Sequence, residues 1–505
     1  MRHTFTLLAA LALTACGGGS GGSNTPPSSS GGVVVLPEPP APQRGTVVGS
    51  PSAVPIVVNG IAINTLEPQQ FKQLLDSAQY GASGITSTPV CAVSVQTVRY
   101  NTVGSAHEAT EASAAVYLPS GTDPACTGPR PVVLYAHGTS PLKSFDMANL
   151  AGTEARLVAG IFAAHGYIVV APNYAGYAGS SLPYHAYLDG EQQAADMIDG
   201  LRASRKAFAQ VLGASKLYVT GYSQGGYVAV ATQRAMQLRY PTEFSVAAAA
   251  GLSGPYSLLK FGESIFGGAP TTGATAFLPM LATAGQRAGA GLYANSADMY
   301  ESRYATGIET LLPGTQSLGE LAASGRLPEK ALFAGNSVPQ TAGYEPFFGD
   351  NNLIRTAYRD SVTADMRNNP CNATAESPLS CSPVQPLRKW LLRNDLRNYG
   401  PTAPLLLCGG DNDPIVPFYN TMAAGDFYRA QKTGAALHVV NVDSTPGLND
   451  DYLQPKLGFL AAKSAVKLNA AVSGGSGDSA VRDAYHAGLV APFCLRAARD
   501  FFRAR

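Results

Sequence analysis

The amino-acid sequence predicts an α/β fold in which helices cover both faces of a mostly parallel sheet, with a large, mainly helical cap inserted. From residue 93 onward, strand-like and helix-like segments alternate along the chain. Such alternation is typical of parallel sheets, because each parallel strand needs a crossover, usually a helix, to reach the next. Between about 257 and 400 the alternation stops, and helix-like, turn-rich sequence replaces it. Residues 217–226 then supply the local signature of the fold: a strand, a tight turn and a helix.

Residues 1–16 have the pattern of an export signal. A short basic start is followed by an apolar run, 4–13, that is too short to span a membrane. The next residues, Leu-Thr-Ala-Cys, resemble a bacterial lipobox, in which Cys16 is lipid-modified and becomes the new N-terminus. An ordinary signal peptide that happens to hold a cysteine is the alternative. The Gly-, Ser- and Pro-rich stretch that follows would tether the protein in the bacterial cell envelope, at the outer membrane or cell surface; the other expectation is a secreted protein.

The expected strands are short and mostly apolar runs, which suit buried strands. In chain order they are 93–100, 112–118, 131–136, 167–171, 217–221, 246–251, 404–408 and 437–442. The expected helices carry apolar residues at helical spacing. They are 151–165, 190–212, one that begins at Tyr227, and 489–503.

The interval 257–400 is too long for a loop of a compact domain, so we expect a cap of its own, inserted before the strand at 404–408. Its aromatic and apolar clusters, such as Phe261, Phe266 and 277–280, predict an inner face that lines an apolar channel. The chain then divides into five parts. They are 1–16, a lipoprotein signal peptide; 17–45, a tether; 46–256, the first part of the core; 257–400, the cap; and 401–505, the second part of the core.

Composition argues against two classes of partner. Charged residues make up 14% of the 505 residues, and the formal net charge is +1 with no basic run. Nucleic acids and anionic membrane surfaces attract strongly basic proteins, so neither is expected as a partner. Contact with the membrane is expected through the lipid anchor alone.

Six cysteines remain when Cys16 is set apart, and export favours their pairing. Six cysteines can pair in fifteen ways. Proximity and position favour three pairs: Cys91–Cys126, Cys371–Cys381 and Cys408–Cys494. Because no C-x-x-C spacing is present, no zinc site is expected.

Ser223 sits between Gly221 and Gly225, where a strand reverses sharply into a helix. Such a turn strains the backbone of the serine, and small neighbours avoid a clash. The hydroxyl then projects from the sheet as a nucleophile, and the N–H of Gln224 lies at a helix N-terminus, where it can donate to an oxyanion. The same G-x-S-x-G pattern occurs in linker sequence at 18–22, so only the context singles out Ser223. The simpler interpretation is a serine in a tight turn.

A serine hydroxyl needs a base to remove its proton, and the base needs an acid to orient it. Asp413, followed by Pro-Ile-Val-Pro, comes after a late strand, and we expect it to be this acid. Asp411 is the alternative, or a neighbour that organises the turn. Two turn-forming aspartates without a catalytic part would explain the same sequence on local grounds.

Seven histidines compete for the part of the base. We expect His486, because it follows the last strand, in a loop, just before the closing helix. His137 lies in a His-Gly turn and is expected to brace the turn that binds the oxyanion, and His185 could line the pocket. The remaining histidines have local explanations in the signal, a loop, a helix end and the last strand: His3, His107, His165 and His438.

The turn 137–140 follows the strand at 131–136, where a second donor to an oxyanion is needed. We expect the N–H of Thr139 to donate there together with that of Gln224. Candidates for supporting the site or lining its pocket are His137, Gly138, Tyr222, His185 and Asp411.

With Ser223, Asp413 and His486 in this order, the sequence resembles the α/β-hydrolase superfamily, and within it bacterial secreted lipases and esterases. The motifs that carry the resemblance are the turn 137–138, the loop 171–177, the elbow 221–225 and the acid loop 410–417. The insertion before the acid strand is similar to the cap of secretory lipases. Two features depart from the family: Asn173 stands where many relatives carry aspartate, and a long stretch, 443–485, precedes His486.

The resemblance implies hydrolysis of carboxylic esters through an acyl-enzyme, with no metal ion and no organic cofactor. The expected substrates are apolar or aromatic esters: lipid-like compounds, aromatic small molecules or polyesters. A serine peptidase of the same fold is one alternative, and it would need an anchor for a peptide terminus. Acidic residues of the cap are candidates for that anchor: Glu301, Glu309, Asp350 and Asp365. A non-catalytic binding lipoprotein is the other alternative, and the complete set of Ser, Asp and His candidates argues against it.

Overall fold

The computed structural model describes residues 43–505, apart from 59, 77–81, 214 and 372–373. The chain divides into two units, Met1–Ala41 and Pro42–Arg505, and the described helices and strands belong to the second unit. The predicted signal peptide with Cys16, and nearly all of the predicted tether 17–45, lie outside the described residues.

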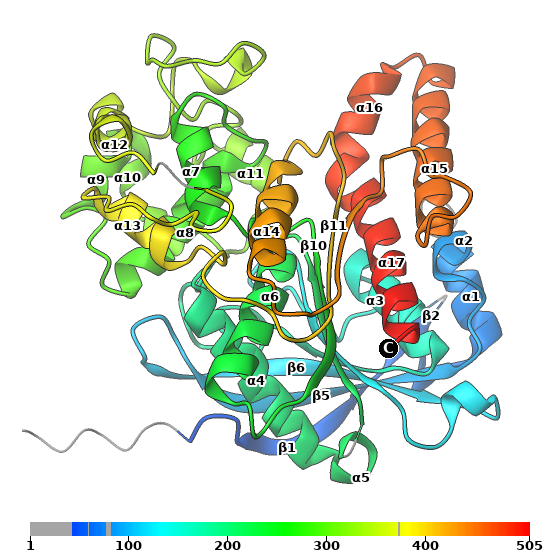
Figure 1. The fold of residues 1–505 in the computed structure, drawn as a ribbon. Helices are drawn as coiled ribbons and strands as arrows, with labels where there is room; N and C mark the ends of the chain where they lie inside the picture. The colour runs from blue at the N-terminus through cyan, green and yellow to red at the C-terminus, as the bar shows by residue number, and fades with distance from the viewer. Residues whose placement is uncertain (1–42, 59, 77–81, 214, 372–373) are drawn as a thin grey trace, which may run out of the picture. The chain divides into compact units, whose positions relative to one another are not determined.

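The centre of the second unit is a sheet with ten described strands, six of which are parallel to one another (Figure 1). In spatial order its main path is β1 (Val47–Val54), β5 (Ala92–Val103), β6 (Ala109–Ser120), β8 (Ile168–Pro172), β7 (Val132–Ala136), β9 (Leu217–Tyr222), β10 (Val246–Leu252), β11 (Leu405–Gly409) and β12 (Leu437–Asn441). From β8 to β12 all neighbours are parallel. The other pairs are antiparallel, including β4 (Thr65–Leu66) with β5 and a separate hairpin of β2 (Ile56–Val58) and β3 (Ile61–Ile63). The predicted fold class is confirmed, and each predicted strand is present.

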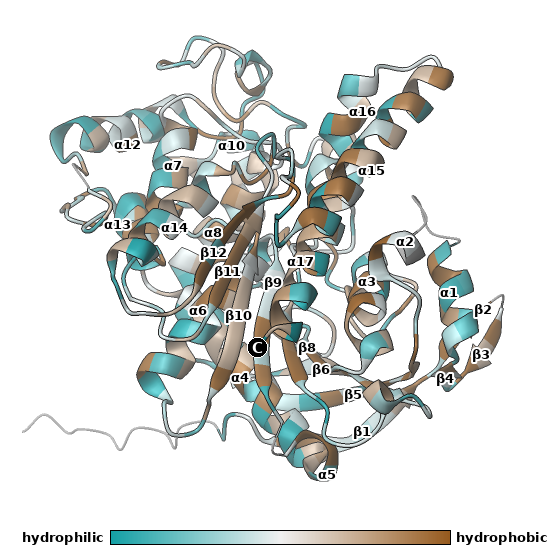
Figure 2. Cartoon of the chain, turned by 45° about the vertical axis from the view of Figure 1, so that its right-hand side comes forward, coloured by the Kyte–Doolittle hydropathy of each residue, from teal (hydrophilic) through white to brown (hydrophobic). Residues whose placement is uncertain are grey.

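Helices cover both faces of the sheet. Its parallel strands are continuous apolar runs, so side chains on both faces need to be buried. Alternate side chains of a strand point to opposite faces: along β7, Leu134 packs into one apolar cluster, and Val133 and Tyr135 pack into the other. Two helices cover the first face and two the second: α4 (Gly190–Ala207) with α6 (Gln224–Arg239), and α3 (Thr153–Ile161) with α17 (Ala491–Arg503). Four more helices of the core complete the layers: α1 (Pro68–Asp76), α2 (Ala82–Thr86), α5 (Ala209–Leu212) and α14 (Tyr419–Ala430). Figure 2 shows the apolar strands between these layers.

The interval between β10 and β11, the predicted cap, is mainly helical (Figure 1). Its helices are α7 (Leu258–Phe266), α8 (Ala274–Arg287), α9 (Ser296–Met299), α10 (Ser302–Ala305), α11 (Leu318–Ala323), α12 (Thr356–Asn368) and α13 (Pro386–Arg393). Buried apolar side chains of the cap belong to the same cluster as those of α4 and α6. Two hydrogen bonds at Asn394 also join the cap to these helices. The hydroxyl of Tyr227 on α6 donates to the carbonyl oxygen of Asn394, and the N–H of Gly190 on α4 donates to its side-chain oxygen. The cap therefore shares its core with one face of the sheet.

The prediction that His486 lies in a loop is wrong. Between β12 and His486 the chain forms a helical hairpin, α15 (Leu453–Val472) and α16 (Gly477–Ala484), whose helices lie side by side (Figure 1). α16 continues through a π-helical turn, Tyr485–Val490, into α17, and His486 lies in that turn. The i→i+5 hydrogen bonds of a π-turn leave no separate period in a sequence. Pro492 has no backbone N–H and is typical of the first turn of a helix, so the sequence indicates that a helix begins here rather than continues.

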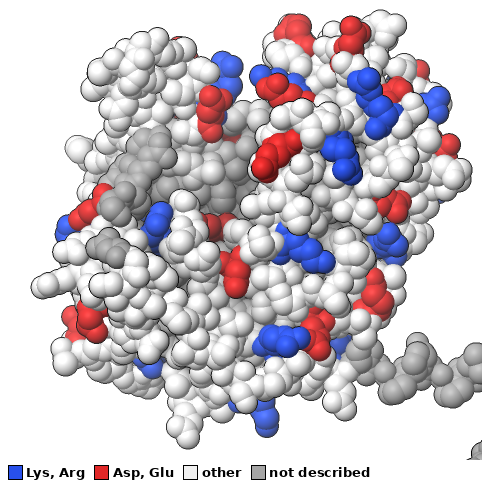
Figure 3. Space-filling view, turned by 180° about the vertical axis from the view of Figure 1, so that it is seen from behind, with Lys and Arg blue, Asp and Glu red and all other residues white. Residues whose placement is uncertain are grey.

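The surface carries few charges, as the composition suggests. On the face in Figure 3, basic and acidic side chains are scattered among uncharged ones, singly or beside a charge of opposite sign. Elsewhere along the described chain, charges are also paired, as in the ion pair Arg202–Glu243 (2.6 Å). In the part of the chain that the structure describes, no helix combines the length and the apolar character needed to cross a bilayer.

The six described cysteines form three disulfides: Cys91–Cys126, Cys371–Cys381 and Cys408–Cys494. These are the pairs expected from the sequence. The third joins β11, which leads to Asp413, to α17, which follows His486. A covalent bond thus holds together two segments that the α15–α16 hairpin separates along the chain.

Candidate active site

Ser223 occupies the turn between β9 and α6. Its backbone has φ 60° and ψ −124°, a strained conformation for a residue with a side chain. The flanking glycines are required by the close approach of another strand: a Cβ on Gly225 would lie 1.9 Å from the carbonyl oxygen of Ala136, and a Cβ on Gly221 would lie 2.4 Å from it. The sharp turn that the Gly-x-Ser-x-Gly sequence predicts is therefore present at 221–225.

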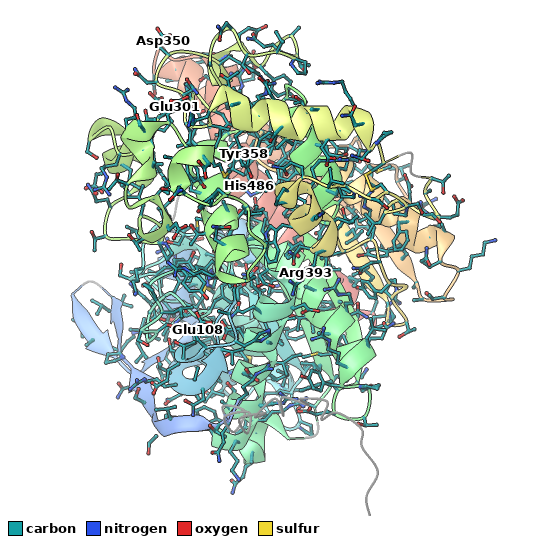
Figure 4. The ribbon with its side chains drawn as sticks, turned by 90° about the vertical axis from the view of Figure 1, so that its left-hand side faces the viewer. Glu108, Glu301, Asp350, Tyr358, Arg393 and His486 are labelled. Carbon is teal, nitrogen blue, oxygen red and sulfur yellow. A yellow bond between two sulfur atoms is a disulfide. The ribbon has the colours of Figure 1, made fainter. Side chains whose placement is uncertain are left out.

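An imidazole lies beside this serine. Oγ of Ser223 is 2.8 Å from Nε2 of His486, and Nδ1 of His486 is 2.7 Å from Oδ2 of Asp413. The three residues come from the turn after β9, the loop after β11 and the π-helical turn before α17. His486, labelled in Figure 4, is 6% exposed, so little water competes for these contacts. The fold thus brings together the three side chains that the sequence singled out.

Asp413 accepts four hydrogen bonds. Its Oδ2 accepts from His486 and from the hydroxyl of Ser253 (2.7 Å), and its Oδ1 accepts from the N–H groups of Ile415 and Val416 (3.0 Å each). Burial by itself would raise the pKa of Asp413, but the imidazole, the hydroxyl and the backbone N–H groups outweigh it and hold the pKa below its ordinary value. The carboxylate is therefore ionised and fixed in orientation.

The loop that carries Asp413 is attached to the turn that carries His486. Asp411 lies on the exposed part of this loop, whereas the N–H of Asn412 donates to the hydroxyl of Tyr485 (3.1 Å). Tyr222, one of the candidates for supporting the site, donates its hydroxyl to the backbone carbonyl oxygen of His486. Of the two aspartates considered, Asp413 is the one in contact with the imidazole.

The two N–H groups expected to bind an oxyanion follow β9 and β7. Gln224 is the first residue of α6, so its N–H has no acceptor within the helix. Thr139 is half-buried in the turn after β7. Glu154 on α3 fixes this turn, because its Oε1 accepts from the N–H of Gly138 (2.9 Å) and from the hydroxyl of Tyr135 (2.7 Å). Burial raises the pKa of Glu154.

His137 is buried next to this turn, as expected of a brace. Its two ring nitrogens lie 2.6 Å and 3.1 Å from the carbonyl oxygens of Gly138 and Asn173. Burial lowers the pKa of His137 to about 4, so the ring is uncharged at neutral pH. Asn173 donates through Nδ2 to Asp146 (2.7 Å). An amide fits this position, since an aspartate would set two carboxylates against each other.

An apolar cavity adjoins Ser223 and Gln224. Most of its lining comes from α7, α8 and α13 of the cap and from the acid loop: Leu258, Phe261, Ile265, Phe266, Phe277, Leu278, Leu281, Leu387, Leu391, Ile415 and Val416. Among the described residues, no charged side chain lines this cavity. The apolar inner face that the sequence predicts for the cap is therefore present, and it faces the serine.

Among the described histidines, His486 is the one that forms a hydrogen bond with Ser223. His185 supports Gln224 rather than lining the cavity: its Nδ1 donates to the carbonyl oxygen of Ala175 (3.0 Å), and its Nε2 accepts from the side-chain amides of Gln193 (3.2 Å) and Gln224 (2.5 Å). The remaining three have surroundings of their own: His107 is exposed, His165 contacts the carbonyl oxygen of Thr86, and His438 contacts the hydroxyl of Tyr452.

Three residues that hold the site together did not emerge from the sequence: Ser253, Glu154 and Tyr485. Ser253 follows β10, the strand beside β11, so its place at a strand end was a usable signal. Tyr485 directly precedes His486, but its contact with the acid loop depends on the fold. Glu154 is one acid in the first turn of a helix, a common position with no distinguishing pattern.

Comparison with known proteins supports this architecture. A model of the prolyl oligopeptidase family matches residues 154–254, a segment that includes Ser223 but neither Asp413 nor His486. No curated protein sequence matches the chain.

Several solved structures are similar in fold. The ligand-bound rice cell wall degrading esterase LipA from Xanthomonas oryzae has a TM-score of 0.68 and 22% identity, over 92% of this chain and 100% of that one. A Legionella pneumophila protein described as a hydrolase has a TM-score of 0.64 and 19% identity, over 91% and 97%. Candida antarctica lipase A has a TM-score of 0.50 and 15% identity, over 86% and 83%. Likeness at these identities establishes the fold, and the chain has the α/β-hydrolase fold.

Proposed function

We propose that the protein is a serine carboxylic-ester hydrolase in which Ser223, His486 and Asp413 form a catalytic triad. One observation supports the proposal above all: hydroxyl, imidazole and carboxylate form a continuous hydrogen-bonded chain, with distances of 2.8 and 2.7 Å, beside an apolar cavity. A serine in a strained turn, a base in contact with it and an acid that orients the base are the parts that acyl transfer requires.

In the proposed reaction, Oγ of Ser223 attacks the ester carbonyl carbon while Nε2 of His486 takes the hydroxyl proton. The tetrahedral intermediate collapses as His486 gives this proton to the leaving oxygen, so an alcohol departs and an acyl-serine remains. Water then attacks the acyl-enzyme with His486 as its base, and the acid is released as Ser223 regains a proton. Asp413 accepts the N–H of Nδ1 and stabilises the imidazolium.

The N–H groups of Gln224 and Thr139 are the proposed donors to the oxyanion. The loss of one such donor typically costs about 3 kcal/mol of transition-state stabilisation. Because the Gly138 N–H is held by Glu154, we expect Glu154 to set the position of the neighbouring Thr139 N–H.

An apolar acyl chain or an aromatic group is the proposed occupant of the cavity, whose lining is almost entirely aliphatic and aromatic. Each buried methylene contributes about 0.8 kcal/mol, so kcat/KM is expected to rise with acyl length until the cavity is filled. The names of two similar structures, an esterase and a lipase, agree with ester chemistry. Lipid-like esters, aromatic esters and polyesters are the candidate substrates.

A serine peptidase of the same fold is the second candidate, because the matching family model is that of prolyl oligopeptidases. The acidic residues considered as peptide anchors do not favour it. Glu309 accepts from Tyr293 (2.7 Å), and Asp365 is buried against Arg388 (2.6 Å). Figure 4 shows the other two, Glu301 and Asp350, at a distance from His486, and none of the four lines the cavity beside Ser223.

We also propose that the protein works outside the cytoplasm, anchored in the bacterial cell envelope through Cys16 or secreted. The three disulfides support export, because such bonds persist in oxidising compartments. Labelling with a radioactive fatty acid tests the anchor: the full chain is expected to take up label, and the Cys16→Ala variant is not.

A fluorophosphonate probe tests the proposed chemistry directly. The full chain is expected to be labelled and to hydrolyse p-nitrophenyl esters, and Ser223→Ala is expected to abolish both. Labelling that survives in Ser223→Ala would contradict the assignment of the nucleophile. Turnover of peptide amides without a preference for esters would favour the peptidase, and no labelling at all would favour a binding protein on a hydrolase scaffold.

A further inference from the structure

The side chain of Gln224 carries a buried acceptor without a partner. Gln224 is 1% exposed and lines the cavity beside Ser223. Its Oε1 has no hydrogen-bond partner among the described residues, whereas its Nε2 donates to His185. A buried carbonyl oxygen left unpaired is costly, so an unpaired one next to a nucleophile calls for a physical explanation.

The hydrogen bonds around His185 fix which end of the Gln224 amide is unpaired. The carbonyl oxygen of Ala175 can only accept, so Nδ1 of His185 carries a hydrogen. Burial lowers the pKa of His185 to about 3, so the ring is neutral and Nε2 is a pure acceptor. Gln193 is oriented independently, because its Oε1 accepts from the N–H of Leu188 (2.9 Å) and its NH₂ therefore faces the ring. A flipped Gln224 would set its oxygen against the lone pair of Nε2.

The other polar groups of the cavity do not occupy this acceptor. The hydroxyl of Tyr187 contacts Oγ1 of Thr139 (3.5 Å), and Thr271 comes from the cap side of the lining. No charged residue of the described chain lines the cavity, so an ammonium group would be left without a counter-charge there. A neutral hydroxyl is the donor that suits an unpaired amide oxygen in apolar surroundings.

We propose that Oε1 of Gln224 determines substrate specificity by accepting a hydrogen bond from a hydroxyl group of the substrate close to the scissile ester. The inference rests on the proposed ester hydrolysis and narrows it to hydroxyl-bearing esters with an otherwise apolar body. The hydroxyl belongs either to the acyl part, as in a 3-hydroxyacyl ester, or to the alcohol part, as in a glycerol monoester. An ester without this hydroxyl leaves the buried oxygen of Gln224 unpaired, so its kcat/KM is expected to be about tenfold lower than that of the hydroxylated ester.

Two matched pairs of substrates test the inference and distinguish the two positions of the hydroxyl. The first pair is p-nitrophenyl 3-hydroxyhexanoate and p-nitrophenyl hexanoate; the second is glycerol monohexanoate and propyl hexanoate. The full chain is expected to prefer the hydroxylated member of one pair by about tenfold. In Gln224→Met, which keeps the length of the side chain and removes the amide, this ratio is expected to fall to near one.

Gln193→Met is the matched control, because Gln193 contacts the same nitrogen of His185 but does not line the cavity. Its ratio is expected to equal that of the unmodified chain. A ratio near one in the unmodified chain for both pairs, or a preference that persists in Gln224→Met, would overturn the role of Gln224. In either case the unmodified chain would still be labelled at Ser223 and would still hydrolyse the plain esters, whereas the absence of both in the unmodified chain would overturn the proposed function itself and the inference with it.

Discussion

Replacement of Asp413 by asparagine is expected to abolish most activity through the tautomer of His486 rather than through the fold. The N–H groups of Ile415 and Val416 both donate to Oδ1, so the asparagine oxygen must occupy that position. The amide nitrogen then replaces Oδ2 and presents a donor to Nδ1 of His486. Nδ1 becomes an acceptor, the ring proton moves to Nε2, and Nε2 can no longer take the proton of Ser223.

The size of this effect follows from the lost base. An asparagine that imposes the wrong tautomer on a triad histidine lowers kcat about 10⁴-fold, equivalent to about 5.5 kcal/mol of activation free energy. Little destabilisation is expected, because the two backbone donors keep an acceptor, and Ser253, which donates to Oδ2 in the unmodified chain, can accept from the new amide. The loss should therefore fall on kcat, with KM and thermal stability nearly unchanged.

Steady-state hydrolysis of p-nitrophenyl butyrate, together with thermal unfolding, measures both quantities. Asp411→Asn is the matched control, since Asp411 belongs to the same loop but is exposed, and it is expected to retain the activity of the unmodified chain. If Asp413→Asn kept more than about a tenth of the activity, or if Asp411→Asn lost as much, the orientation argument would be refuted.

Four further predictions follow from individual contacts. Glu154→Leu frees the N–H of Gly138 and should lower kcat about tenfold with KM unchanged, while Glu154→Gln, which keeps an acceptor, should restore most of it; equal losses in both would contradict a positioning role. Burial raises the pKa of Asp196 to about 7, so the folded state binds this proton more tightly than the unfolded state. This carboxyl should therefore contribute a fall in the free energy of unfolding of about 1.4 kcal/mol per pH unit between roughly pH 4 and pH 7. Urea unfolding at a series of pH values should show a smaller pH dependence of the free energy of unfolding in Asp196→Asn. An unchanged pH dependence would contradict the raised pKa of this carboxyl. Replacing both cysteines of Cys408–Cys494, which are 86 residues apart, should lower the free energy of unfolding by about 4.6 kcal/mol. For Cys371–Cys381, which are 10 residues apart, the expected loss is about 2.7 kcal/mol, and denaturant unfolding that ranked the two losses the other way would refute this. Leu281→Trp should fill part of the cavity and shift the preferred ester to a shorter acyl chain, and an unchanged chain-length profile would place the acyl group elsewhere.

The parts of the site set by local sequence could be predicted, and those set by packing could not. Ser223 was identifiable because the strand, glycines and helix around it are contiguous, and the constraint on Gly225 comes from the adjacent strand of the same unit. Asp413 was identifiable for a similar reason, since its loop directly follows a buried strand. For both residues the chemistry assigned to them remains a prediction.

Other features depend on segments that meet only in the folded chain. The contact between Ser253 and Asp413 arises because β10 and β11 are neighbours in the sheet, although the whole cap lies between them in the sequence. The π-helical turn around His486 has no sequence period of its own, so the segment was predicted as a loop. The unpaired oxygen of Gln224 follows from the tautomer of His185, which is set by Ala175, and no local pattern reveals it.

The core shared by the cap and the α4–α6 face bears on how a substrate reaches the serine. Swinging the cap outward as a rigid body would pull Leu258 and Trp390 out of the cluster that also contains Tyr227, and would break the hydrogen bonds at Asn394. Every 100 Å² of apolar surface exposed in this way costs about 2.5 kcal/mol, so a wide hinge opening would consume much of the stability of an ordinary domain. We therefore expect a substrate to reach Ser223 by rotation of individual side chains, without a rigid-body movement of the cap.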